Sequence, residues 1–380
     1  MNRRFVLSLF AAAFVASWGV AAVARDQHPR GASGAVYAMT NATDDNQVVV
    51  FGRNGAGLLS LVGAVSTLGA GSGGGLDPLA SQGSLVLSAD NRWLLAVNAG
   101  SHEISVFRVK RDGLDLADKV DSGGEFPVSI AVSHNLVYVL NAGGAPNITG
   151  FYLGRHGRLT LREQSIRTLG TGGFAQVGFD PRGDNLVVTG RDQNEILVFP
   201  LGRHGLPAAE PVTTTSNGIA PFGFTFDQNG NLLVAEAGSG AVSHYGFADD
   251  GSLRVISPSV ENGQAATCWI AKNERGYIFT ANTGSQTLSA YGLVERTDPR
   301  GKDRRWKHGY GDDLELLDAT AGFGNRPIDM DISANGRFLY ALDPGSETID
   351  MFEIEADGSL TDLGTVGGGF AIFAQGIAAR

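Results

Sequence analysis

Residues 92–107 read RWLLAVNAGSHEISVF, and this stretch contains the unit from which the chain is built. An apolar run, residues 94–97, leads through Asn98 and a short turn containing Gly100 to a second apolar run that ends at Phe107. Branched and aromatic residues on both sides of a tight turn are typical of a β-hairpin. The stretch therefore predicts two antiparallel strands, and it predicts the same pair wherever the pattern recurs.

The pattern recurs seven times along the chain. Each copy is an apolar run that ends in a small or polar residue, which we call the anchor, followed by a second run that ends in an aromatic residue. The anchors are Asn41, Asn98, Asn141, Gly190, Glu236, Asn282 and Asp343. Successive anchors lie between 43 and 61 residues apart, which fits one four-stranded propeller blade with its loops. The sequence predicts an all-β, seven-bladed β-propeller with almost no helix.

The two ends of the repeat predict how the ring closes. The first copy, residues 36–41, has no inner strand before it, whereas residues 373–378 resemble an inner strand with no copy after it. We expect the C-terminal strand to join the first blade, because a closed ring leaves fewer exposed sheet edges. The propeller is therefore predicted as a single domain over residues 34–380.

The first 24 residues have the pattern of an export signal. Arg3 and Arg4 precede an apolar run over residues 5–20, and Ala22 and Ala24 form a small-residue cleavage site. This pattern predicts a cleaved signal peptide (1–24), a linker (25–33) and a periplasmic or extracellular location. An uncleaved membrane anchor is the alternative, although the run is short for a bilayer span. The arginine pair leaves the route open between general and twin-arginine export.

Charge and composition exclude several partners. The formal net charge of −10 argues against nucleic acid, since phosphate binding needs concentrated positive charge. After the signal peptide no apolar run is long enough to span a bilayer, so we expect no membrane partner once it is cleaved. Cys268 is the only cysteine, which excludes an internal disulfide, and we expect a buried, inert thiol. The histidines show no metal-ligand spacing, so we expect no metal and no cofactor.

Two segments depart from the repeat. Residues 67–79 are rich in glycine and are predicted to form a flexible loop. Residues 295–313 carry six basic side chains followed by Asp312 and Asp313. They are read either as a solvated insertion in the sixth blade or as a lid or anion-binding arm.

The candidate site is the axial channel. Alignment of the inner strands places seven residues at one level, Ser84, Ser129, Gln176, Gly223, Cys268, Asp329 and Gln375. A mostly polar ring indicates either a ligand-accessible tunnel or side chains that satisfy ordered water.

The anchors provide a second ring of candidates. Asparagine at a strand end is most often a turn former, but Glu236 and Asp343 depart from that pattern. Glu236 is a candidate general base, and Arg191, which follows the Gly190 anchor, is a candidate for binding a carboxylate. A structural ion pair is the alternative for either side chain.

The blades, and residues 92–107 in particular, resemble the lactonase propellers. This family includes the propeller-type 6-phosphogluconolactonases and the fungal carboxymuconate-lactonizing enzymes. The resemblance spans roughly residues 34–379, and it implies seven blades and metal-free carbonyl chemistry on a small lactone or carboxylate-bearing ligand. The family's catalytic arginine and histidine are not retained, because Phe222 and Gln176 stand at the matching places. Only the glutamate of the family motif is retained, as Glu236.

Two hypotheses follow. In the first, the chain is a lactonase-like hydrolase or cycloisomerase that acts at the channel mouth, with Glu236 as base and Arg191 orienting the substrate. Its expected substrate-binding residues are Gln176, Asn282, Asp329, Asp343 and Gln375. In the second, the propeller has lost its chemistry and serves as a binding or scaffolding module. The sequence identifies no protein partner.

Overall fold

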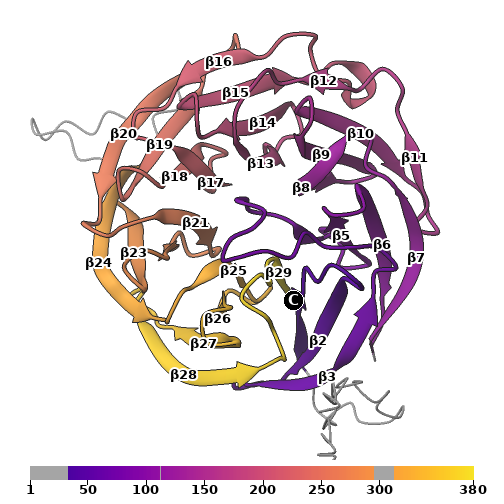
Figure 1. The fold of residues 1–380 in the computed structure, drawn as a ribbon. Helices are drawn as coiled ribbons and strands as arrows, with labels where there is room; N and C mark the ends of the chain where they lie inside the picture. The colour runs from indigo at the N-terminus through magenta and orange to yellow at the C-terminus, as the bar shows by residue number, and fades with distance from the viewer. Residues whose placement is uncertain (1–32, 112, 295–311) are drawn as a thin grey trace, which may run out of the picture.

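The computed structural model describes residues 33–111, 113–294 and 312–380, which form a closed ring of seven antiparallel β-sheets (Figure 1). In these residues the only helical element is the short 3-10 turn η1 (Arg203–Gly205). The predicted all-β, seven-bladed propeller is confirmed.

Each blade is one sheet whose strands run outward from the axis. Blade 1 contains β29 (Ile377–Ala379), β1 (Gly34–Met39), β2 (Gln47–Arg53) and β3 (Leu59–Ser66). Blade 2 contains β4 (Leu85–Leu87), β5 (Trp93–Asn98), β6 (Glu103–Val109) and β7 (Leu114–Asp121). Blade 3 contains β8 (Glu125–Ser133), β9 (Leu136–Gly143), β10 (Asn147–Leu153) and a divided outer edge, β11 (Leu159–Leu161) and β12 (Arg167–Thr168).

The remaining blades repeat this order. Blade 4 contains β13 (Phe174–Phe179), β14 (Asn185–Gly190), β15 (Glu195–Pro200) and β16 (Val212–Thr215). Blade 5 contains β17 (Pro221–Phe226), β18 (Leu232–Glu236), β19 (Ala241–Phe247) and β20 (Leu253–Glu261). Blade 6 contains β21 (Thr267–Lys272), β22 (Ile278–Asn282), β23 (Thr287–Val294) and β24 (Asp313–Phe323). Blade 7 contains β25 (Ile328–Ile332), β26 (Phe338–Asp343), β27 (Thr348–Ile354) and β28 (Leu360–Gly367).

The repeated hairpin forms the two middle strands of each blade. In blade 2, every residue of β5 is buried, whereas in the outermost strand β7 only Leu114 is buried and the other residues are half-buried or exposed. The aromatic residue that ends the hairpin, such as Phe107 or Tyr245, is fully buried between neighbouring sheets. Burial of one such ring stabilises the fold by about 2–3 kcal/mol.

The C-terminal strand closes the ring, as the sequence predicts. β29 pairs antiparallel with β1 over Val36–Ala379, Tyr37–Ala378 and Ala38–Ile377. The strand starts at Ile377, four residues later than expected, because Gly376 has a φ of 101° and breaks the extended conformation before it. The side chain of Gln375 is consequently free to contact the loop at the axis.

The ring has two faces of different character. The strands of each blade alternate in direction, so the anchors, which end the second strand, lie on the same face as the crossovers that follow the outermost strand. We call this face the anchor face. The tight turns that follow the inner strands, such as the turn at Asp180, lie on the other face, which we call the turn face.

Several sequence predictions fall on residues outside the described ranges. The predicted signal peptide (1–24) and nearly all of the linker (25–33) lie there, as do residues 295–311 of the charged insertion. The described ends of that insertion, Val294 and Asp313, pair with each other in blade 6 at the turn face. In the described residues, no helix is long and apolar enough to cross a membrane.

Candidate functional site

A loop of the chain itself enters the axis of the ring. The glycine-rich segment that follows β3 crosses the anchor face and turns into the centre, where Figure 1 shows it as an indigo loop. At its end, the Ser81 hydroxyl donates a hydrogen bond to the Val128 carbonyl of blade 3 (2.8 Å). The Ser81 carbonyl accepts bonds from Trp269 Nε1 of blade 6 (2.9 Å) and Gln375 Nε2 (2.8 Å). The segment predicted to be a flexible loop is therefore packed at its far end.

Gln82 spans the axis next to Ser81. Its backbone N–H donates to the Ala175 carbonyl of blade 4 (3.1 Å), and its side-chain amide bonds both the N–H (3.0 Å) and the carbonyl (2.8 Å) of Ile270 in blade 6. A Cβ at Gly223 would lie 2.1 Å from Gln82 Oε1, so only glycine fits there. We call Ser81 and Gln82 the axial plug. The open tunnel that the polar ring suggested is wrong at this level, because the plug fills it.

The other polar ring residues mainly bond backbone groups. Gln176 Nε2 donates to the Phe224 carbonyl (3.2 Å) and its Oε1 accepts from the Phe224 N–H (2.7 Å), so one amide joins blades 4 and 5. Gln375 accepts from the N–H of Leu79 (3.0 Å) and donates to Asp77 Oδ1 (2.9 Å). Both predicted binding residues therefore hold the axis together in this structure.

The anchors hold the crossover loops. Asn282 Oδ1 accepts from the Thr267 hydroxyl (2.7 Å) and its Nδ2 donates to Ser289 Oγ (2.8 Å). Asp343 Oδ1 accepts from the N–H groups of Arg326 (3.0 Å) and Ser346 (3.2 Å). The bond from the Ser346 N–H to Asp343 matches the turn-forming alternative, whereas Asn282 bonds the side chains of Thr267 and Ser289 and not the backbone of its own hairpin.

Glu236, the base predicted from sequence, lies inside blade 5. Its side chain is 0% exposed, and its Oε1 accepts from the Ser216 hydroxyl (2.6 Å) and more weakly from the Tyr245 hydroxyl (3.4 Å). Oε2 has no hydrogen-bond partner among the described residues, and burial raises the pKa of the carboxyl group. The carboxylate of Glu236 is therefore enclosed, although one of its oxygens is unpaired.

Arg191 lies at the mouth of the axis on the anchor face. Its guanidinium group lies over the ring of Phe222, 5.9 Å from the centroid, and its Nε has no hydrogen-bond partner in the described structure. The side chain is 28% exposed. Gly173 leaves room for it, since a Cβ there would be 2.4 Å from Nη2. Because Nε is buried, a molecule bound at the mouth would meet the guanidinium group through its terminal nitrogens.

Asp77 lies at the same mouth, on the loop before the plug. It is partly exposed, and its burial raises its pKa to about 7, although the Gln375 hydrogen bond and the Arg191 charge lower it. Burial and the charge of Asp77 raise the pKa of the Cys268 thiol, and the charge of Arg191 lowers it. Asp77, Arg191 and Cys268 therefore share one neighbourhood, and with Phe222 we call them the mouth cluster.

Sequence reasoning missed Asp77 because it lies in the glycine-rich stretch outside the repeat. A carboxylate two residues after Gly73–Gly75 and next to Pro78 was the available signal. The repeat alignment did place Arg191 and Cys268 near the axis.

Asp329 is a second perturbed carboxyl group near the mouth. It has a positive φ of 50° at a bulge in β25, is 3% exposed, and leaves Oδ2 without a partner among the described residues. Burial, with the charges of Asp331 and Asp77, raises its pKa well above the ordinary value.

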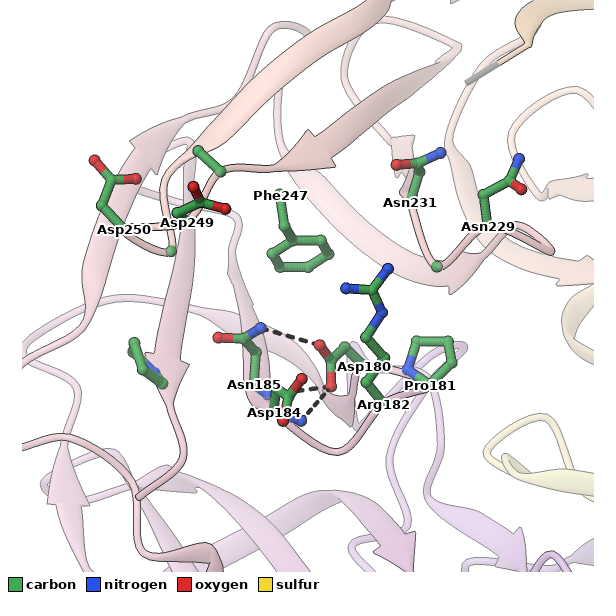
Figure 2. A pocket seen from close by; sticks show the side chains of 14 residues that line it. Asp180, Pro181, Arg182, Asp184, Asn185, Asn229, Asn231, Phe247, Asp249 and Asp250 are labelled. Atoms are coloured by element: carbon green, nitrogen blue, oxygen red, sulfur yellow. Dashed lines mark hydrogen bonds between the residues drawn. The ribbon is translucent and has the colours of Figure 1, made fainter. Parts of the chain in front are cut away.

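The turn face has a cavity of about 670 Å³ between blades 4 and 5. It is lined by the turns at residues 180–185, 229–231 and 247–251, and Figure 2 shows that Asp180 bonds Asp184 and Asn185 within its own turn. No predicted site residue lines it. Asp180 is engaged by its own turn, and the hydrogen bonds from Ser252 lower the pKa of the exposed Asp250.

Among the residues described, no three His, Cys, Asp or Glu side chains are grouped so that they could hold a metal ion. The mouth presents the guanidinium group of Arg191 and two carboxyl groups with raised pKa values, those of Asp77 and Asp329.

Comparison with known proteins supports the lactonase resemblance. Residues 35–169 match the family described as lactonase, seven-bladed β-propeller. A candidate 6-phosphogluconolactonase from Bacteroides fragilis has a similar structure, with a TM-score of 0.69 at 17% identity, over 93% of this chain and 100% of that one. The periplasmic gluconolactonase of Pseudomonas aeruginosa has a TM-score of 0.69 at 15% identity, over 91% and 98%. At such identities the likeness concerns the fold. No curated protein matches the sequence.

Proposed function

We propose that this lactonase-like propeller is a hydrolase that opens a small lactone at the anchor-face mouth of its axis. The observation that supports the proposal best is that packed side chains connect Arg191 to Asp77. The guanidinium group of Arg191 lies over Phe222, whose ring is 5.2 Å from that of Trp269. Trp269 and Gln375 both donate to the Ser81 carbonyl, and Gln375 also donates to Asp77. A carboxylate whose pKa is about 7 and a partly exposed guanidinium group are the two groups that such a hydrolysis needs.

The mechanism uses Asp77 as base. The carboxylate takes a proton from a water molecule, whose oxygen forms a bond to the lactone carbonyl carbon. Arg191 donates hydrogen bonds to the carbonyl oxygen as negative charge develops there. The ring C–O bond then breaks, and the protonated Asp77 returns the proton to the leaving alkoxide, which yields a hydroxy acid.

Glu236 is the competing base. Its unpaired Oε2 and raised pKa are compatible with proton transfer, but its side chain is 0% exposed. We place Asp77 first because a base must come within hydrogen-bond distance of the water that it deprotonates.

The test is a lactone-hydrolysis assay with pH-indicator readout on the purified protein and its Asp77→Asn, Arg191→Met and Glu236→Gln variants. We expect Asp77→Asn to lower kcat by about 100-fold or more without changing the thermal midpoint. Activity that survives in Asp77→Asn and disappears in a folded Glu236→Gln would assign the base to Glu236. Binding without turnover by the unmodified protein would support the non-catalytic alternative, and NMR of the product separates hydrolysis from isomerisation.

The pH dependence gives a first prediction. Because Asp77 acts in its ionised form, kcat/KM should rise as the pH rises through about 7 and then level off. The measurement is kcat/KM between pH 5 and 9, corrected for spontaneous hydrolysis. A profile that falls over this range contradicts Asp77 as base.

We also infer that the chain is exported to the periplasm or beyond. The support is the leader pattern of residues 1–24, with its Ala22 and Ala24 cleavage site. Mass spectrometry of the protein from cell fractions tests this, and a mature chain that begins at Arg25 is expected. An intact N-terminus in the cytoplasmic fraction would contradict it.

A further inference from the structure

The side chain of Asp192 lies beside the guanidinium group of Arg191. Its Oδ1 is 3.9 Å from Arg191 Nε, and its Oδ2 accepts a hydrogen bond from the Gly173 N–H (2.7 Å). The side chain is 57% exposed, so it faces the solvent at the mouth. The carboxylate of Asp192 thus accepts the hydrogen bond of the Gly173 N–H and lies beside the guanidinium group of Arg191.

These two groups are the ones that a phosphate would use. Phosphates bind to backbone N–H groups in glycine-containing turns, and they bind to guanidinium groups. Gly173 lacks a side chain that would displace Arg191, so its N–H and the Arg191 guanidinium group both lie beside the carboxylate of Asp192, at 2.7 Å and 3.9 Å. The carboxylate of Asp192 already occupies the donor.

The charge balance at the mouth points the same way. The carboxylate of Asp192 places a negative charge beside Arg191 at the mouth. In the mechanism above, Arg191 serves the reacting carbonyl oxygen. A phosphate dianion beside Arg191 would therefore face the carboxylate of Asp192 at the position where it needs the Gly173 N–H as a donor.

We propose that Asp192 is a specificity residue, which occupies the place of a phosphate group and makes the mouth select unphosphorylated lactones over lactones that carry a phosphate ester. The inference rests on the lactonase function proposed above. Such selectivity comes from repulsion of the phosphate ester by the Asp192 carboxylate as well as from binding of the unphosphorylated lactone.

The test compares glucono-lactone with its 6-phosphate ester as substrates. We expect kcat/KM of the unmodified protein to be about tenfold or more higher for the unphosphorylated lactone. In Asp192→Asn, which keeps an acceptor for Gly173, the ratio of the two values should shift about tenfold toward the phosphate ester. The shift should shrink at high salt, because exposed charges are screened.

Asp184→Asn is the matched control, since Asp184 is an exposed carboxylate of the same blade on the turn face. It should leave the ratio unchanged. A preference of the unmodified protein for the phosphate ester, or an equal ratio in Asp192→Asn, would overturn the inference while leaving the lactonase function intact.

If neither lactone is turned over, the proposed function is contradicted. The binding of inorganic phosphate then tests the role of Asp192 independently of catalysis. Calorimetric titration with inorganic phosphate should show affinity at least about tenfold higher for Asp192→Asn than for the unmodified protein. Equal affinities would refute the role of Asp192.

Discussion

Gly173 has no side chain at a place where the guanidinium group of Arg191 needs the space. A Cβ there would lie 2.4 Å from Nη2 and 2.9 Å from Nε, at the end of a flexible side chain. Such a side chain moves aside at little cost in stability, but Arg191 then leaves its position over Phe222. This glycine therefore positions a functional group and contributes little to the stability of the blade.

Gly173→Ala should accordingly lower kcat/KM about tenfold or more and leave the thermal midpoint within about 2 °C of the unmodified protein. Gly63→Ala is the control, because a Cβ at Gly63 has no atom within 4 Å. Equal kinetics for the two variants would show that Arg191 is not held by this contact.

Asp343 and Asp350 are two buried carboxyl groups in blade 7 at places where other blades have an asparagine and a serine. In blades 2 and 6 the anchor asparagine donates to a serine hydroxyl, from Asn98 to Ser105 and from Asn282 to Ser289. Blade 7 has two buried carboxyl groups at these places, and burial together with the Asp343 charge raises the pKa of Asp350 to about 7.

This pair predicts a pH-dependent loss of stability. The folded-state pKa of Asp350 lies above its unfolded value, so the folded protein binds more protons between about pH 4 and 7. The stabilisation is present below pH 4 and is lost as the pH rises toward 7. Asp350→Asn should raise the free energy of unfolding at pH 8 by about 1–2 kcal/mol and flatten this dependence. Urea unfolding at several pH values measures it, and an unchanged slope would contradict the assignment.

At the scale of elements, glutamine side chains replace missing strand partners. The inner strands present an unpaired edge to the axis, where Gln82 bonds both backbone groups of Ile270 and Gln176 bonds both of Phe224. A side-chain amide has the donor and the acceptor of a peptide group, so it satisfies two buried backbone groups at once.

Gln82→Leu should destabilise the fold by about 2–4 kcal/mol, because it leaves the N–H and carbonyl of the buried Ile270 without partners. Chemical denaturation measures this loss, and Gln164→Leu at an exposed position is the control. If both variants lose the same small amount, water has replaced the amide and the plug is not a structural element.

The repeat explains why the blades were predictable and the mouth was not. Each copy repeats the same local order of apolar run, anchor, turn and aromatic residue, so seven copies define the hairpins from Val36 to Phe352 without any long-range information. The axial plug and Asp77 belong to one segment that occurs once, and their partners in blades 3, 4 and 6 lie far away in sequence. No local pattern encodes such contacts.

At the scale of the whole molecule, the last residues join the ring to the site. β29 supplies the innermost strand of blade 1, and the Arg380 carbonyl accepts a hydrogen bond from the Ala35 N–H (3.2 Å). Immediately before it, Gln375 bonds Ser81 of the plug and Asp77 of the mouth cluster. Closure of the ring and the position of Asp77 therefore both depend on residues 371–380.

Removal of residues 371–380 should consequently do more than fray one edge. It exposes the buried side of β1 and removes Ile377, so we expect a loss of about 5 kcal/mol in the free energy of unfolding. Hydrogen exchange should increase in β1, in the plug and at Ile270 of blade 6, because the plug has lost Gln375. Gln375→Ala in the full chain separates the two effects, since it should loosen the plug and leave the β1–β29 pairing protected. Faster exchange confined to β1 in the truncated protein would mean that the ring holds without its closing strand, and that the plug is kept in place by blades 3, 4 and 6 alone.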